Sequence, residues 1–298
     1  VEVMSGADGA VHAQVITGTT PYGQGHRTTW AMLVSDRLGI PFENITVVHG
    51  DTDLVRSGEI TGGSRSVQIG GTNVWRAAGV VADKARQIAA RLLEASVEDI
   101  VLEDGRFHVA GTPSVTRSWT DVIATAMAMG ERLDGEGDFT QASGTFPSGA
   151  HLAVVEVDIE TGKVTLREMF AVDDAGCIVN TLLAEGQVHG GLAQGIGQAL
   201  YEEFIYDADG NPLTGNFADY GFPSAAEVPS FVTIHMESPS PMNDLGAKGI
   251  GESGTIGATP AVVNAVADAL ARHGNKQLSS QLQMPLTPFR MWQLMYSA

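Results

Sequence analysis

Residues 182–203 read LLAEGQVHGGLAQGIGQALYEE, and this stretch constrains the fold more than any other part of the chain. Its apolar residues recur at helical spacing, with Val188, Leu192, Ile196 and Leu200 on one line. The same stretch contains five glycines, and each glycine weakens an isolated helix by roughly 1 kcal/mol relative to alanine. We therefore predict that another backbone or a ligand packs closely against this helix.

Composition narrows the class of protein. The chain has 298 residues, of which 43% are hydrophobic, and this predicts a globular protein with two ordinary domains or one large domain. The net charge of −18 argues against binding to nucleic acid or to anionic membranes, because no basic face can form to neutralise phosphates. No apolar run is long enough for a transmembrane helix, and the first residues show no signal-peptide pattern, so we expect a cytoplasmic location.

The start of the chain and its cysteine content suggest that other polypeptides are involved. Val1-Glu2-Val3 reads as the beginning of a strand, so we expect a fragment or a processed subunit. The single cysteine, Cys177, excludes an internal disulfide and an iron–sulfur cluster held by this chain alone.

The order of expected elements indicates an α+β protein with two mixed subdomains, residues 1–145 and 146–298. The boundary is placed in residues 134–149, which are rich in glycine, serine and acidic residues and show no clear period. Both halves share a loose plan in which a strand is followed by a glycine-rich turn with a glutamine and then by a helix. We expect strands at 11–17, 44–49, 151–158, 163–172 and 231–237, helices at 72–95, 121–129, 182–203 and from Thr259 to Gly274, and a loop at 275–283.

Two glycine-rich runs in the first half are candidate ligand loops. Residues 23–29, GQGHRTT, open a helix, where unpaired N–H groups attract anions and where Gln24 and Thr28 could add donors. A plain glycine turn capped by threonine is an equally good interpretation. Residues 61–66, TGGSRS, precede the long helix. They could also line a phosphate or a heterocycle, although taken alone they read better as a flexible loop.

Two further runs lie in the second half. Gln187 and Gln194, on the glycine-rich helix, could recognise the edge of a heterocycle, or they could be exposed amides. Residues 246–254, GAKGIGESG, place Lys248 and Glu252 among glycines, so that Glu252 is either a surface turn residue or a base aimed into a pocket. The run matches G-x-G-x-x-G, but no strand directly precedes it, which argues against a dinucleotide fold. Asp173 and Asp174 read as loop acids.

In this order, the four runs resemble the large subunit of the xanthine dehydrogenase, aldehyde oxidase and aerobic carbon monoxide dehydrogenase family, the molybdenum hydroxylases. The resemblance extends over nearly the whole chain and corresponds to the C-terminal part of such a subunit. It implies a molybdopterin cofactor with molybdenum, often as the cytosine dinucleotide in bacterial members. It also implies as partners the N-terminal half of the large subunit, an iron–sulfur subunit and an FAD subunit.

The resemblance assigns roles to individual residues. Glu252 matches the family's catalytic base, which takes a proton from a metal-bound hydroxyl, and no residue of this chain is expected to ligate the metal. Lys248 is expected to point at the cofactor and away from Glu252. The implied cofactor-binding residues are Gly23, Gln24, Gly25, His26, Thr28, Gly62, Gly63, Ser64, Ser66, Asn180, Gln187, Lys248, Gly249 and Gly251.

The leading hypothesis is the cofactor-binding, catalytic part of an enzyme that oxidises an aldehyde, an N-heterocycle or carbon monoxide with water as the oxygen source. Such a part is expected to be inactive without the missing half. One alternative is a non-catalytic assembly domain of the same fold. A weaker alternative is a nucleotide-dependent oxidoreductase that uses residues 249–254.

Overall fold

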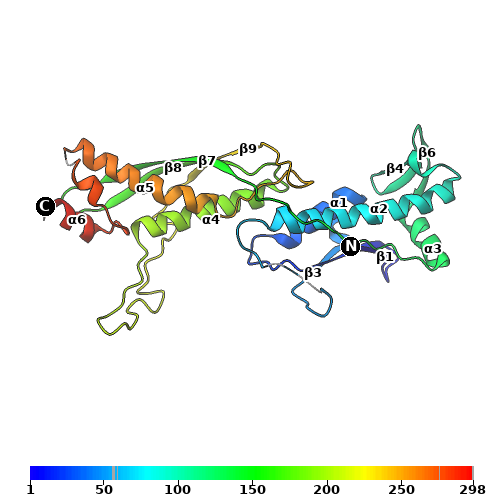
Figure 1. The fold of residues 1–298 in the computed structure, drawn as a ribbon, viewed down its shortest axis with the longest axis horizontal. Coiled ribbons are helices and arrows are strands. Elements are labelled where there is room, and N and C mark those ends of the chain that lie inside the picture. Colours follow the sequence, from blue (N-terminus) through cyan, green and yellow to red (C-terminus); the bar gives the residue numbers. More distant parts are fainter. Residues whose placement is uncertain (56–57, 59, 275, 297–298) are drawn as a thin grey trace. The chain divides into compact units, whose positions relative to one another are not determined.

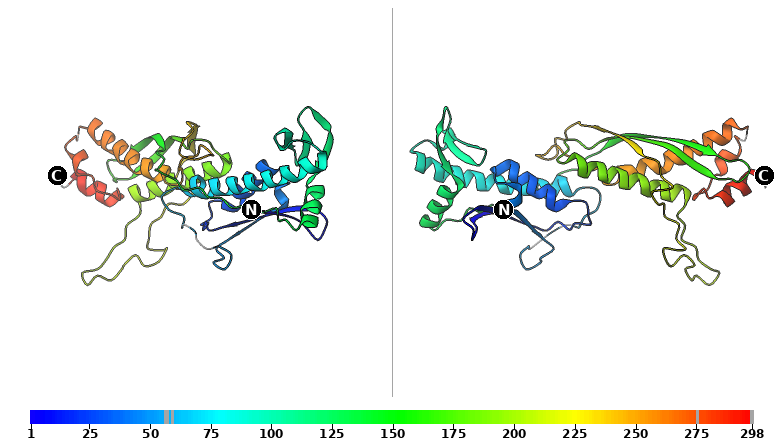
Figure 2. Two further views of the ribbon diagram at one scale, coloured as in Figure 1. Left: turned by 45° about the vertical axis from the view of Figure 1, so that its right-hand side comes forward. Right: turned by 180° about the vertical axis from the view of Figure 1, so that it is seen from behind.

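The computed structural model describes residues 1–55, 58, 60–274 and 276–296. Within these residues the chain forms six α-helices and three three-stranded sheets, which confirms the predicted α+β class. The chain divides into two compact units (Figures 1 and 2). The first unit consists of residues 1–145 and 239–247, and the second consists of residues 146–238 and 248–298.

The first unit is built on a mixed sheet that packs against one helix, and this helix packs against a second helix. The outer strand pairs antiparallel with the central strand, and the third strand pairs parallel with it. Trp30 is fully buried between the two helices, where its ring lies against Gly71. The elements are β1 (Glu2–Ser5), β2 (Val11–Thr17), α1 (His26–Leu38), β3 (Ile45–His49) and α2 (Thr72–Leu93), with a π-helical turn at Val67–Gly71 before α2 and a 3-10 turn at Phe42–Asn44.

A small antiparallel sheet and a helix complete the first unit. The indole N–H of Trp119 donates to the Leu38 carbonyl at 2.9 Å, which ties this helix to the end of α1. Ser118 and Asp121 form a capping box at the helix start. The elements are β4 (Ile100–Glu103), β5 (Arg106–Val109), β6 (Thr112–Ser118) and α3 (Trp119–Met129), with a 3-10 turn at Val97–Asp99.

The second unit repeats the plan of the first. Its hairpin pairs antiparallel, and its third strand pairs parallel with the second strand of the hairpin. A core of Met169, Leu192, Ile196 and Leu270 fills the space between the sheet and the helices. The elements are β7 (Ser148–Val157), β8 (Val164–Asp174), α4 (Thr181–Leu200), β9 (Phe231–Met236), α5 (Ser253–Arg272), a 3-10 turn at Leu278–Gln281 and α6 (Pro288–Tyr296).

Both units therefore share the order strand, strand, helix, strand, helix. Among the described residues, the glycine-rich turn with a glutamine that was expected before a helix in both halves is present only in the first unit, because Gln187 lies within α4. In each unit a helix connects two parallel neighbouring strands. The loops that follow those strands must leave from the same edge of the sheet, because parallel strands have their carboxyl ends on one side. This topology brings two loops together in each unit.

Helices α4 and α5 approach each other through glycine, as the sequence predicts. A Cβ atom added to Gly191 would lie 3.0 Å from the Gly254 Cα atom, and one added to Gly254 would lie 2.6 Å from the Val188 carbonyl oxygen. Thr255 Oγ1 donates to the Gly191 carbonyl at 3.0 Å. Side chains larger than hydrogen at this crossing would force the backbones apart.

The sequence misplaced the start of α5. Thr259 and Pro260 were expected to be the cap and the first residue of the helix, but α5 begins at Ser253 and contains Pro260. An internal proline costs about 3 kcal/mol or more, and the contacts of Gly254 and Ala258 with α4 keep the backbone helical in spite of it.

The sequence also misjudged the last part of the chain. Residues 275–283 were expected to be a loop, but Leu278–Gln281 forms a 3-10 helix. The helix Pro288–Tyr296 was not expected at all. The 3-10 turn packs against α5, α6 packs against the turn, and Leu278 and Met291 join the core of the unit. The local polar sequence gives no sign of this packing. Asn275 lies outside the described residues.

Adjacent glycines of α4 give a matched test of the crossing. Gly190 is exposed, and nothing lies within 4 Å of the place that a Cβ atom would take, so Gly190→Ala should raise the free energy of unfolding by about 0.5–1 kcal/mol through helix propensity. Gly191→Ala should lower it by about 1–3 kcal/mol through overpacking. Urea unfolding followed by the fluorescence of Trp292, the one tryptophan in the second unit, measures both. Shifts in the same direction would contradict the crossing geometry.

Candidate functional site

In the first unit, the loop after β2 and the segment after β3 are hydrogen-bonded to each other. The side-chain amide of Gln24 donates to Thr61 Oγ1 at 3.0 Å, and the Thr61 N–H donates to Thr20 Oγ1 at 3.3 Å. Thr61 Oγ1 lies 3.4 Å from Ser66 Oγ. The segment that the sequence favoured as a flexible loop is therefore joined to the Gln24 loop at the carboxyl edge of the sheet.

The glycines of these two segments leave open space beside the backbone. A methyl group built on Gly23, Gly62 or Gly63 would meet nothing within 4 Å. Gly23 and Gly63 also have φ angles of 97° and 64°, which L-residues rarely adopt. Gly25 lies immediately before α1, whose first N–H groups have no acceptor within the helix. Backbone and amide donors beside open space suit an anionic ligand.

His26 was expected to bind the ligand at this loop, but its side chain is buried in the core. Its side chain is 3% exposed and its ring centre lies 5.0 Å from that of Trp30. Burial, with a smaller effect of nearby His49, lowers the pKa of His26. The ring belongs to the core, so His26 can offer the loop its backbone but not its side chain. Thr28 is half-buried in the first turn of the same helix.

In the second unit, Glu252 occupies the position just before α5. Its carbonyl accepts from the Ile256 N–H at 3.0 Å, so it joins the first helical turn. Gln187 adjoins Val188, whose carbonyl contacts Gly254 at the helix crossing. The crossing therefore packs the start of α5, just after Glu252, against the part of α4 that follows Gln187. Glu252 was expected in a pocket built jointly with another segment, and in this chain by itself it is exposed.

Lys248 is anchored by an acid that the sequence misassigned. Lys248 Nζ lies 2.7 Å from Asp174 Oδ2, and the two side chains are 14% and 7% exposed. Asp174 was interpreted as a loop acid, but it is the last residue of β8 and is buried. The N–H groups of Gly176 and Ser238 donate to Asp174 Oδ1 at 2.9 and 3.0 Å. Burial opposes ionisation, but Lys248, Ser238 and Gly176 outweigh it and hold the pKa of Asp174 well below its usual range.

Asp173 was misassigned in the same way. It is 3% exposed, and each of its oxygens lies 3.2 Å from His151 Nε2. The His151 ring lies against Gly257 of α5, where a Cβ atom would approach its Nδ1 atom to 2.1 Å. The sequence did contain a signal for these partners, since two acidic residues end an apolar strand. Acidic residues need partners when they are buried.

Two polar residues of α4 have structural partners. Asn180 caps the helix, and its side chain accepts from the Leu183 N–H at 2.9 Å. Gln194 accepts from Thr255 Oγ1 at 3.2 Å, so it links α4 to α5. Gln194 is exposed and Gln187 is half-buried, and the role of the pair around a heterocycle stays a prediction.

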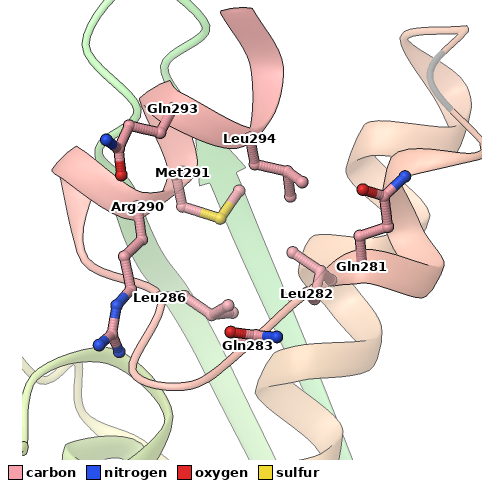
Figure 3. A pocket seen from close by; sticks show the side chains of 8 residues that line it. All are labelled: Gln281, Leu282, Gln283, Leu286, Arg290, Met291, Gln293 and Leu294. Carbon is pink, nitrogen blue, oxygen red and sulfur yellow. The ribbon is translucent and has the colours of Figure 1, made fainter. Parts of the chain in front are cut away.

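Other features of the described residues lie away from these loops. No group of three or more His, Cys, Asp or Glu side chains among them could hold a metal ion, and no helix in the same part of the chain is long and apolar enough to cross a membrane. An open cavity of about 500 Å³ lies near α6, with Leu282, Leu286 and Leu294 on its walls and Arg290 at its side (Figure 3). None of the predicted site residues lines it.

Comparison with known proteins assigns the chain to a family. A profile of the molybdopterin cofactor-binding domain matches residues 1–229. The chain belongs to this family. It is 38% identical over 280 residues to the carbon monoxide dehydrogenase large chain of Hydrogenophaga pseudoflava, and 41% identical over 282 residues to the nicotine 6-hydroxylase large subunit of Paenarthrobacter nicotinovorans. Each alignment covers 92% of this chain and 34% of the relative.

The fold of the family is also shared. The crystal structure of quinoline 2-oxidoreductase from Pseudomonas putida 86 superposes with a TM-score of 0.88 at 36% identity, covering 98% of this chain and 37% of that one. The chain thus spans about a third of the length of the relatives it matches. The residues present fit a molybdopterin, since the glycine-lined loops of the first unit offer N–H and amide donors beside open space.

The ion pair between Lys248 and Asp174 gives a stability prediction. Asp174→Asn leaves a buried ammonium without its counter-charge and should lower the free energy of unfolding by about 3 kcal/mol. Asp268→Asn is the matched control in the same unit, because Asp268 pairs with Arg272 on an exposed helix surface, and it should cost less than about 0.5 kcal/mol. Urea unfolding measures both, and equal effects would contradict the buried pair.

The same carboxylate predicts a pH dependence. The folded-state pKa of Asp174 is lowered, so its stabilisation is complete above the ordinary aspartate pKa of about 3.9 and is lost as the pH falls. The difference in unfolding free energy between wild type and Asp174→Asn should stay constant from about pH 7 to about pH 5 and shrink towards about pH 3. Urea unfolding at each pH measures it. A difference that widens in acid would refute the ionised pair.

Proposed function

We propose that this chain is the cofactor-binding and catalytic portion of a cytoplasmic molybdenum hydroxylase. The enzyme would oxidise a small substrate, an aldehyde, an N-heterocycle or carbon monoxide, with water as the oxygen source. The observation that carries this proposal is the position of Glu252, at the start of a helix that the glycine crossing packs against α4. Relatives named for carbon monoxide and for nicotine support the substrate classes.

The cofactor of this proposal is a molybdopterin, in its cytosine dinucleotide form. When bound, it supplies the redox centre for the oxidation. Residues 1–145 and 146–298 would act as its two binding subdomains. The residues that would hold it are Gly23, Gln24, Gly25, the His26 N–H, Thr28, Gly62, Gly63, Ser64 and Ser66 in the first, and Asn180, Gln187, Lys248, Gly249 and Gly251 in the second.

Glu252 is the proposed catalytic base. Its carboxylate would accept the proton that water releases when its oxygen is transferred to the substrate, and a positioned base contributes about 10²–10⁴-fold to such a step. A base of this kind works best where bulk water is excluded. Since Glu252 is exposed in this chain, another part of the enzyme would have to cover it.

The proposed partners follow from what the chain lacks. The N-terminal half of a large subunit would complete the site, and iron–sulfur and FAD subunits would carry electrons away. With Cys177 as its only cysteine, this chain has no ligand set for an iron–sulfur cluster. The names of two relatives, a large chain and a large subunit, support a multi-subunit enzyme.

The alternative is a non-catalytic assembly domain that keeps the fold. It shares every structural element with the leading proposal and differs in Glu252, which an assembly domain does not need. Membership in the molybdopterin family favours both of these functions over a nucleotide-dependent oxidoreductase.

Glu252→Gln tests the proposal in the assembled enzyme. The amide cannot accept the proton, so kcat should fall by about 10²-fold or more. Molybdenum and pterin content, measured by metal analysis and by pterin fluorescence after release, should stay unchanged. Glu160→Gln, in an exposed turn of the same unit, is the control and should leave turnover unaltered. Normal turnover in Glu252→Gln with full molybdenum would favour the assembly domain.

A further inference from the structure

One face of the β7–β8–β9 sheet is apolar and uncovered. The register pairs Leu152 with Phe170 and Phe170 with Val232, and it pairs Val172 with Ile234. Residues that are paired across strands point to the same side of a sheet. We call this side the outer face. It consists of Leu152, Phe170, Val172, Val232, Ile234 and Met236.

The opposite face of the same sheet is already buried. Met169 and Ala171 alternate with the outer residues along β8 and belong to the core with residues of α4 and α5. These two helices run along the sheet (Figure 1). A sheet with one solvated face normally alternates apolar and polar residues, whereas strands that are apolar on both sides are typical of sheets covered on both sides. In β8 the run of residues 169–172 is apolar on both sides of the sheet.

The outer face is exposed in the chain by itself. Leu152 and Ile234 are each 56% exposed and Met236 is 57% exposed. The apolar character ends at Val154, which pairs with the exposed Glu168, and beyond the bulge in β7 Glu156 and Arg167 form an exposed ion pair. A contiguous apolar patch with a charged border marks a surface that another protein covers.

We propose that the outer face is the docking surface for the part of the large subunit that this chain does not span. This inference rests on the proposed function. About two thirds of each relative lies outside the region that matches this chain. The rest of such a subunit is long enough to cover the outer face. The net charge of −18 disfavours a second copy as the covering layer, since two such chains repel each other.

The outer face ends next to the ion pair between Asp174 and Lys248. Its last residue, Met236, pairs with Asp174, the residue that anchors Lys248. Protein that covers the outer face would therefore reach the carboxyl ends of β8 and β9. The segment that leads to Glu252 begins at this edge of the sheet. Docking would place further protein at the edge where the exposed catalytic candidate needs cover.

Cysteine labelling tests the docking surface directly. In a Cys177→Ser background, Val232→Cys places a thiol on the outer face, and Val115→Cys places one on exposed strand β6 of the other unit; the native side chains are 47% and 52% exposed. Each variant is labelled with a maleimide, alone and co-expressed with the polypeptide that completes its large subunit. The thiol at 232 should react freely in the chain alone and roughly tenfold or more slowly in the assembly. The thiol at 115 should react equally in both.

Charge insertion supplies a second measurement. Val232→Lys should leave the chain folded by circular dichroism, because the position is exposed, and it should reduce co-purification with the completing polypeptide by roughly tenfold or more, since burying an unpaired ammonium is costly. Val115→Lys should co-purify normally.

Several outcomes would overturn the inference. Equal labelling at 232 in both states would show an uncovered face. Protection already present in the chain alone would mean that the first unit covers the face, or a second copy if size-exclusion chromatography reports a dimer. Pterin content separates the two proposals. An assembly that holds molybdopterin but leaves residue 232 reactive contradicts only the docking surface, whereas a protected assembly without molybdopterin contradicts the proposed function.

Discussion

The close approach of α4 and α5 is the constraint on which the second unit depends. Gly191 and Gly254 allow the two backbones to touch, and no larger side chain fits between them. The contact offsets the helix propensity lost to five glycines in α4 and keeps α5 helical through Pro260. It also packs the start of α5, which follows Glu252, against α4.

Parallel strand pairing supplies the second constraint. In both units a helix connects two neighbouring parallel strands, so the segments after those strands leave from one edge of the sheet. In the first unit this brings Gln24 to Thr61. In the second unit it brings Asp174 to Lys248. The same topology thus builds a donor-rich loop pair in one unit and anchors the segment before Glu252 in the other.

The β7–β8–β9 sheet is well packed on the side that faces α4 and α5, and it is exposed on the other side. Asp173 and Asp174 close β8 and are partnered by His151 and Lys248, so both acidic residues at this edge of the sheet are paired within the chain. The outer face and Glu252, in contrast, are exposed in this chain. Both belong to a protein that spans about a third of its relatives' length.

The sequence by itself determined the α+β class, the close packing of the glycine helix and the family, because these depend on local periodicity, glycine content and ordered motifs. Only the tertiary structure decided that α5 starts at Ser253, that Asp173 and Asp174 are buried partners, and that His26 belongs to the core. Those features depend on contacts between residues far apart in the chain. Local propensity does not encode such contacts, and at Pro260 it opposes the structure that they impose.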